Sequence, residues 1–155
     1  MQKADTQGYP WRNQVALPGG HIDLLDSSPL DAAFRELEEE LGIGKNQVSL
    51  ICSLGHFQTI NNRDIQVFCG TWNENGPVRF DPSEISRVIE IPLMDLFCIH
   101  MNRGYHGRVP EMTELMYPFR DVVIWGVTGR IIHFLLETLS GVLKSDGLSE
   151  CRSTG

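Results

Sequence analysis

The sequence lacks the features that would direct it to a membrane or to a nucleic acid polymer. No apolar run reaches the roughly 20 residues that a membrane-spanning helix needs, and we expect no secretory leader. Basic residues are few, because 13 Lys and Arg face 20 Asp and Glu and leave a net charge of −7. Since tight binding to polymer phosphates needs clustered Lys and Arg, neither a nucleic acid polymer nor a membrane is expected as a partner.

Cysteine is scarce and follows no metal-binding or redox spacing. The four cysteines include no CxxC pair and no Cys/His pattern (Cys52, Cys69, Cys98 and Cys151). A reducing cytoplasm is therefore the simplest expected location. Cys52 and Cys69 lie in strand-like runs and are expected to be buried thiols.

The remaining composition is that of a compact soluble enzyme. A chain of 155 residues that is 41% hydrophobic is long enough to bury one real core. We expect a single domain over residues 1–143 and a mobile polar tail over residues 144–155.

The clearest positive signal is a helix expected over residues 29–41. Ser28 can cap its N-terminus, and Pro29 suits the first helical position. Gly42 can adopt the left-handed conformation that ends a helix. Both ends of this helix are therefore marked by local chemistry.

Three glutamates share one face of this helix. Glu36, Glu39 and Glu40 stand at i, i+3 and i+4, where like charges cost roughly 0.2–0.5 kcal/mol per pair. A divalent cation would compensate them, because carboxylate oxygens are the hard ligands that Mg²⁺ and Mn²⁺ prefer. A solvated acidic face is the alternative. The metal site is favoured because Arg35 can pair with Glu39 one turn away, and because Gly20 lets the backbone approach a ligand closely.

Residues 35–43 resemble the signature of the Nudix hydrolases. That box reads glycine, five residues, glutamate, seven residues and REUXEEXGU, where U is a bulky aliphatic, and RELEEELGI stands in register with it. The spacer departs from the box, since Asp26 replaces the glutamate and eight residues precede Arg35. The coenzyme A diphosphatase branch is similar in its PGG turn, its DxxD spacing, as in Asp23 and Asp26, and its longer spacer.

Two later segments also resemble that branch. Residues 82–96, PSEISRVIEIPLMDL, are similar to its acidic loop and following strand, and residues 123–136, VIWGVTGRIIHFLL, to its C-terminal helix. The resemblance implies an α/β fold, a Nudix-type α/β/α sandwich around a mixed β-sheet. Only sixteen residues precede Leu17, so we expect that N-terminal strands of that sheet are missing. Another segment or a second copy would fill their place, which makes a homodimer one expected outcome.

The resemblance also implies the chemistry. It implies hydrolysis, dependent on Mg²⁺ or Mn²⁺, of a diphosphate linkage in a small nucleoside diphosphate derivative, most closely coenzyme A or acyl-coenzyme A. It assigns the metal to three carboxylates and one backbone carbonyl (Glu36, Glu39, Glu40 and Gly20). Arg35 would orient Glu39, and the general base would be Glu36 or the loop residue Glu84. Alternatives are ADP-ribose, dinucleotides or nucleoside triphosphates as substrates, and an inactive Nudix-like binding module.

Four further residues are candidates for substrate binding. Trp11 and Arg12 can present flat faces to a base, with a packed strand end as the alternative. His21 follows the glycine turn and can meet a phosphate, unless it serves only as a surface residue. His56 lies at a strand-to-loop edge and can line the pocket.

For the rest of the chain we expect alternating strands and loops followed by one helix. Strands are predicted over residues 48–54, 65–72 and 88–91. A long irregular stretch is predicted over residues 94–119, and a helix over residues 122–143. Within the irregular stretch, His100 and His106 flank a basic loop that would close on an anionic substrate or else remain a mobile surface loop.

Overall fold

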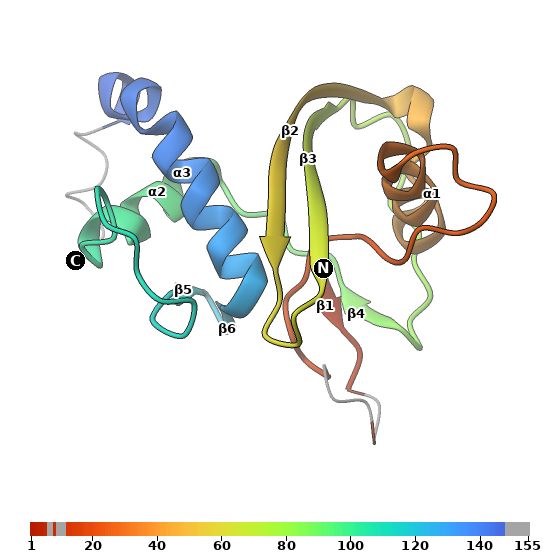
Figure 1. Ribbon diagram of the computed structural model, residues 1–155, viewed down its shortest axis with the longest axis horizontal. Coiled ribbons are helices and arrows are strands. Elements are labelled where there is room, and N and C mark those ends of the chain that lie inside the picture. The colour runs from red at the N-terminus through yellow and green to blue at the C-terminus, as the bar shows by residue number, and fades with distance from the viewer. Residues whose placement is uncertain (6–7, 9–11, 148–155) are drawn as a thin grey trace. The chain divides into compact units, whose positions relative to one another are not determined.

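The computed structural model describes residues 1–5, 8 and 12–147 (Figure 1). Helices and antiparallel strands alternate along the chain, which confirms the expected α/β class. The chain divides into two compact units, one of residues 1–58 and 62–89 and the other of residues 59–61 and 90–155. No described helix combines the length and the hydropathy needed to cross a membrane.

The predicted helix of the first unit is confirmed, and its boundaries are those expected. Helix α1 spans Pro29–Leu41. The Ser28 hydroxyl accepts a hydrogen bond from the Asp31 N–H at 3.1 Å. Gly42 ends the helix in the left-handed conformation, with φ of 67°, and its N–H donates to the Glu38 carbonyl at 2.9 Å.

Removing the N-cap of α1 is expected to destabilise the protein. Ser28→Ala should lower the free energy of unfolding by about 1 kcal/mol, because the Asp31 N–H loses its acceptor. Urea denaturation monitored by circular dichroism measures the change. Ser28→Thr, which keeps the hydroxyl, is the control and should retain most of the stability; equal losses in the two variants would contradict the capping role.

The strands of the first unit form two antiparallel pairs. Strands β2 (Val48–Gln58) and β3 (Asp64–Trp72) make a long hairpin, preceded by a short 3-10 helix, η1 (Lys45–Gln47). Strand β1 (Gln2–Lys3) pairs with β4 (Ile85–Arg87). Figure 1 shows the hairpin as the longest strand pair of the chain. The strand predictions over residues 48–54 and 65–72 are thus confirmed, although β2 runs further.

Two expectations for this unit are wrong. No strand forms over residues 88–91, because the ladder with β1 uses Ile85 and Arg87 instead. Cys52 is exposed rather than buried, since most of β2 faces solvent, while Cys69 is half-buried.

The core of the first unit joins α1 to the strands and to the start of the chain. One cluster of buried residues comes from distant segments (Met1, Leu41, Ile43 and Ile85). Partly buried apolar side chains pack around them (Leu37, Val48, Trp72, Val78, Phe80 and Val88). The apolar face of α1 is thereby buried, and the opposite face carries the charged residues.

The second unit contains two helices and a short hairpin. Helix α2 (Leu93–Asn102) precedes strands β5 (Tyr117–Phe119) and β6 (Val122–Ile124), and helix α3 (Gly126–Gly147) follows them. The stretch over residues 94–119 is therefore not irregular throughout. The C-terminal helix starts later than residue 122, because Arg120, with φ of 53°, turns the chain into the β5–β6 hairpin.

A buried polar network lies inside this unit. His100 is fully buried, and its Nδ1 lies 3.0 Å from the Tyr117 hydroxyl while its Nε2 lies 2.7 Å from Oε1 of Glu137. Burial lowers the pKa of His100. Burial alone would raise the pKa of Glu137, but hydrogen bonds with His100, His106 and the Gly107 N–H lower it to about 2. The carboxylate of Glu137 is therefore ionised at neutral pH.

Candidate metal centre

Arg35 organises the charged face of α1. Its Nε and Nη2 donate to the two carboxylate oxygens of Asp26 at 3.1 and 3.0 Å. Its Nη1 donates to Glu36 at 2.9 Å and to Glu39 at 3.0 Å. Its Nη2 also reaches the His21 carbonyl at 2.8 Å. One guanidinium thus ties the helix to the loop that precedes it.

These contacts favour the ionised forms of Arg35 and Asp26. The hydrogen bonds that Arg35 donates to Asp26, and then to Glu36, raise its pKa. The hydrogen bond from Arg35, and then that from the Asp23 backbone, lowers the pKa of Asp26. A carboxyl group whose pKa is lower in the folded than in the unfolded protein stabilises the fold at pH values above its unfolded pKa. This stabilisation is lost as the pH falls through the folded pKa. The Asp26–Arg35 link is therefore intact at neutral pH.

Glu40 is joined to the glycine turn and to the first strand. Its Oε1 lies 2.7 Å from the Lys3 ammonium, and its Oε2 accepts a hydrogen bond from the Gly19 N–H at 3.0 Å. Only 10% of the Glu40 side chain is exposed. The Lys3 ammonium shows that Oε1 of Glu40 already attracts a positive charge. A metal ion that binds Oε1 would displace this ammonium.

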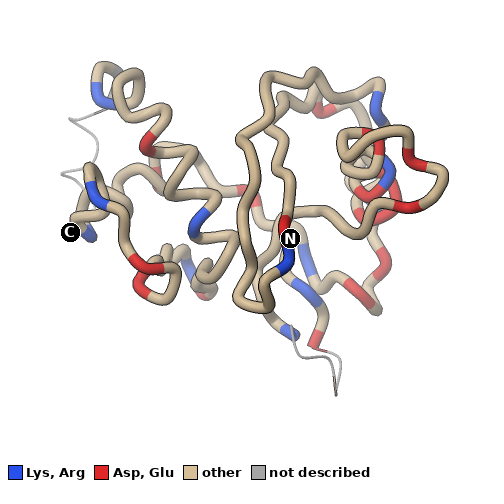
Figure 2. Tube along the Cα trace, viewed as in Figure 1, with Lys and Arg blue, Asp and Glu red and all other residues tan. Residues whose placement is uncertain are grey.

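Gly20 lies directly against the carboxylate of Glu36. A β-carbon at residue 20 would overlap that carboxylate, so glycine lets the Glu36 side chain lie against the turn and a larger residue would displace it. Glu36 and Glu40 therefore reach the same turn, one beside Gly20 and the other at Gly19. Figure 2 shows the acidic residues gathered on α1 and the loop before it. This set of oxygen donors fits Mg²⁺ or Mn²⁺.

The other predicted site residues are not joined to this cluster by their side chains. Trp11 lies outside the described residues. Arg12 is exposed, with its Nε 3.8 Å from the Asp5 carboxylate. Glu84 is exposed in the turn before β4, and its backbone carbonyl accepts a hydrogen bond from the Ala4 N–H. Among described residues, neither the Arg12 nor the Glu84 side chain has a hydrogen bond or ion pair with α1.

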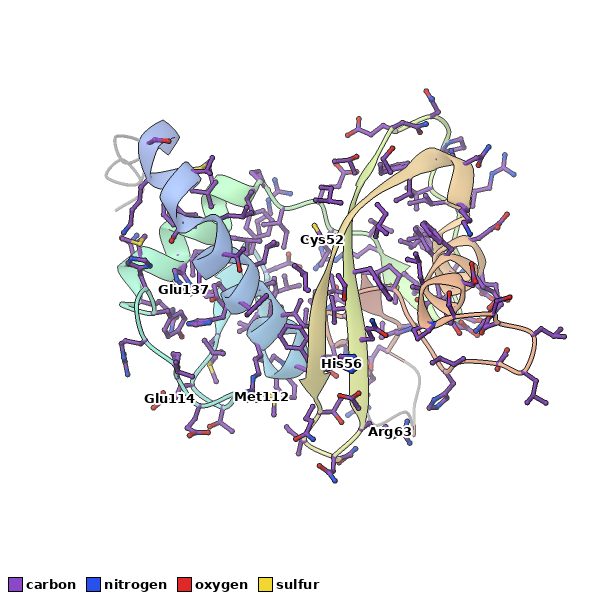
Figure 3. The ribbon with its side chains drawn as sticks, turned by 45° about the horizontal axis from the view of Figure 1, so that its top comes forward. Cys52, His56, Arg63, Met112, Glu114 and Glu137 are labelled. Atoms are coloured by element: carbon purple, nitrogen blue, oxygen red, sulfur yellow. The ribbon has the colours of Figure 1, made fainter. Side chains whose placement is uncertain are left out.

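The two histidines predicted to bind substrate lie on exposed parts of the first unit. The ring Nε2 of His21 is 3.5 Å from the Arg63 guanidinium. His56 Nδ1 lies 2.6 Å from the Asp64 carboxylate across the β2–β3 hairpin. Figure 3 shows His56 and Arg63 towards the turn end of this hairpin. His21 thus stands beside a guanidinium that can bind a phosphate, whereas His56 is paired with a carboxylate.

Two positioning residues were not predicted from the sequence. Lys3 contacts Glu40 across 37 positions of the chain, and no local pattern signals such a contact. Asp26 was noted for its spacing alone, whereas the structure places it against Arg35. A signal for Asp26 did exist, because a carboxylate in the loop before an arginine-bearing helix is a natural partner for the guanidinium.

Comparison with known proteins identifies one domain and a group of similar chains. The NUDIX domain matches residues 1–116. An uncharacterized Nudix hydrolase NudL of Photorhabdus laumondii is 28% identical over 129 residues, which cover 80% of this chain and 67% of the relative. The protein of the same description from Escherichia coli K12 is 32% identical over 127 residues, which cover 79% of this chain and 65% of the relative. The chain thus spans about two thirds of the length of these curated relatives.

Proposed function

The chain belongs to the Nudix family, and we propose that it is a metal-dependent hydrolase of a diphosphate linkage in a nucleoside diphosphate derivative. The observation that carries this proposal is the meeting of Glu36 and Glu40 at the Gly19–Gly20 turn. A binding module would not need carboxylates held this closely against a glycine backbone. We therefore favour an active hydrolase over the inactive Nudix-like module.

The metal ligands in this proposal are those of the charged face. Three carboxylates and one backbone carbonyl hold the ion (Glu36, Glu39, Glu40 and Gly20). When bound, Mg²⁺ or Mn²⁺ supplies charge neutralisation on the phosphates and orientation of the attacking water. Arg35 keeps Glu36 and Glu39 in place, and Lys3 holds Glu40 when no cation contacts its Oε1.

The general base in this proposal is Glu36 or Glu84. Glu36 lies beside the glycine turn, so a water there would be close to the phosphate. Glu84 stands in an exposed turn, from which a carboxylate can reach a bound substrate. Comparing pH–rate profiles of Glu36→Gln and Glu84→Gln separates them, because only loss of the base removes the acidic limb.

Within the family, we propose coenzyme A or an acyl-coenzyme A as the substrate. The longer spacer and the Asp23–Asp26 spacing support this choice. Both carboxylates face Arg35, Asp26 at 3.0 Å and Asp23 at 3.7 Å, so the spacing serves to anchor the arginine. Arg12, His21 and His56 offer the cationic and imidazole groups that a nucleotide would require, and Trp11 a stacking surface.

The cysteines and the exposed strand β2 bear on the cellular location and the assembly of the chain. We propose a reducing cytoplasm as the location, on the cysteine spacing of the sequence. Cys52 and Cys69 are free thiols, whereas Cys98 is disulfide-bonded. A homodimer is supported by β2, which pairs only with β3 among the described strands and exposes Leu50 and Ile51. Sedimentation of the purified chain tests this assembly, and a monomer at every concentration would contradict it.

A substrate panel tests the proposed function. The purified chain with Mg²⁺ is assayed for product release from coenzyme A, acetyl-coenzyme A, ADP-ribose, NADH, diadenosine polyphosphates and nucleoside triphosphates. Selective hydrolysis of coenzyme A or its acetyl derivative is the expected result. Selective hydrolysis of another compound would keep the chemistry and overturn the substrate, whereas no hydrolysis of any compound would favour the binding module.

Adding a methyl group at the glycine turn is expected to impair this activity. Gly20→Ala forces its β-carbon into the Glu36 carboxylate, so the turn or the ligand must move. A displacement of about 1 Å at a reacting centre costs roughly 100-fold in rate, and kcat should fall by that order. Gly141→Ala, where a β-carbon meets open space, is the control and should retain full activity. Normal turnover by Gly20→Ala would contradict the close approach.

A further inference from the structure

The second unit contains a cluster of possible metal ligands that the proposed hydrolysis does not use. We propose that His100, His106 and Glu137 form a zinc-binding site. One ligand atom from each residue lies within 4.8 Å of the others. Two imidazoles and one carboxylate make a set that suits Zn²⁺ and leaves a fourth position for water. This inference is independent of the α1 carboxylates.

The three residues come from three different segments and meet at one carboxylate oxygen. His100 lies on α2 and His106 on the loop that follows. Glu137, which is labelled in Figure 3, lies on α3. His100 Nε2 is 2.7 Å and His106 Nδ1 is 2.8 Å from the same oxygen, Oε1 of Glu137. Ligand atoms that already meet at one point need only small shifts to surround an ion.

Neighbouring groups form hydrogen bonds that orient these ligands. The Gly107 N–H donates to the other oxygen of Glu137 at 3.1 Å, which leaves Oε1 facing the two rings. The Tyr117 hydroxyl lies 3.0 Å from His100 Nδ1 and fixes the orientation of that ring. Such outer contacts to metal-bound histidine and carboxylate groups are the rule in zinc proteins. The site thus has its orienting partners as well as its ligands.

The three ligands differ in their exposure to solvent, which leaves one side of the cluster accessible. His100 is fully buried, whereas the side chains of Glu137 and His106 are 26% and 30% exposed. An ion and its water can therefore enter from the side of His106. Next to the cluster, buried His133 is 5.1 Å from His100 between ring centroids, and its Nε2 has no hydrogen-bond partner among the described residues.

A purely structural hydrogen-bond network is the competing explanation. Without an ion, each imidazole donates its proton to Glu137, and Lys144 Nζ lies 2.7 Å from His106 Nε2. Since an ammonium can only donate, Lys144 keeps the proton of His106 on Nδ1, where a metal would bind. If the cluster is a metal site, removal of Lys144 should therefore tighten zinc binding, whereas a purely structural network should bind no zinc with or without Lys144.

Zinc titrations against a chromophoric chelator distinguish them. The chain carries Cys52→Ser and Cys69→Ser, so that the two facing thiols cannot bind the ion. With Mg²⁺ in excess to occupy the α1 carboxylates, zinc should bind at about one ion per chain. Glu137→Gln and His106→Gln should each weaken binding by at least about 10-fold, while Lys144→Met should tighten it. Glu111→Gln, the same change as Glu137→Gln at an exposed glutamate of the second unit, is the control and should leave the affinity unchanged.

Cobalt substitution gives a second readout that a structural role would not produce. Co²⁺ bound by this set should absorb in the visible range as a four-coordinate ion, and Glu137→Gln should abolish the absorption while circular dichroism stays native. Absence of stoichiometric zinc in the parent chain, or equal zinc affinity in Glu137→Gln, would overturn the site. Zinc affinity that Lys144→Met leaves unchanged or weakens would contradict binding at Nδ1 of His106.

Discussion

Turnover of a diphosphate substrate is expected to fall by roughly 10²–10³-fold when Glu40 is replaced by glutamine. The amide keeps the size of the side chain but removes the negative charge that a metal ligand must carry. The fold should be retained, because the Lys3 ammonium beside it is partly exposed and can be hydrated. Steady-state kinetics with Mg²⁺ measure kcat, and circular dichroism confirms the fold.

Two matched variants show whether the loss is specific to Glu40. Glu38→Gln makes the same change at an exposed position of α1 and should leave kcat within a factor of about 2–3, since surface substitutions are close to neutral. Lys3→Met removes the ammonium from Oε1 of Glu40 and should lower the Mg²⁺ concentration needed for half-maximal activity. Near-normal turnover by Glu40→Gln would rule out Glu40 as a metal ligand.

Replacing Arg35 with lysine is expected to lower activity by about 10–100-fold and to lower the melting temperature. A lysine ammonium is a single point, whereas the guanidinium of Arg35 spans both oxygens of Asp26 and reaches Glu36, Glu39 and the His21 carbonyl. Glu36 and Glu39 would then lose their fixed positions. Kinetics over a range of Mg²⁺ concentrations and thermal unfolding measure both effects.

The pattern of the loss identifies the role of Arg35 as positioning. If the arginine acts by holding the carboxylates, excess Mn²⁺, which tolerates altered coordination, should restore part of kcat in Arg35→Lys. Arg79→Lys, the same change at an exposed arginine of the first unit, should leave both activity and melting temperature unchanged. Unaltered kinetics in Arg35→Lys would contradict the positioning role.

Local chemistry predicted the helix that carries the charged face. Ser28, Pro29 and Gly42 mark its ends within one or two residues of the helix itself, so no distant contact was needed to place α1. The Arg35–Glu39 contact follows from the same helical spacing. The ends of this helix and the side-chain pair within it were therefore predictable from the sequence.

Contacts between distant segments could not be read in the same way. Lys3 meets Glu40 because β1 pairs with β4, a ladder of two-residue and three-residue strands without a periodic pattern. Likewise His106 and Glu137 are 31 positions apart, and only the fold brings them together. Contacts of a site that depend on tertiary structure cannot be predicted from the spacing of residues along the sequence.

The second unit was the less predictable part of the fold. Helix α2 begins after Pro92 without a side-chain cap, so neither a capping residue nor a loop marked its start. Residues 122–124 form an apolar run that suits a strand or a helix equally, and the left-handed Arg120 decides for the hairpin. The errors at α2 and at residues 122–124 arose because the local sequence signals were weak there and tertiary packing determined the secondary structure.

Metal dependence is the most direct test of the claim that the α1 carboxylates carry diphosphate hydrolysis. Product release from the best substrate of the panel is followed with Mg²⁺, then with excess chelator, and again after Mg²⁺ is restored. The expected result is loss of hydrolysis with chelator and its full return with Mg²⁺. Hydrolysis that continues at an undiminished rate in excess chelator would contradict the account.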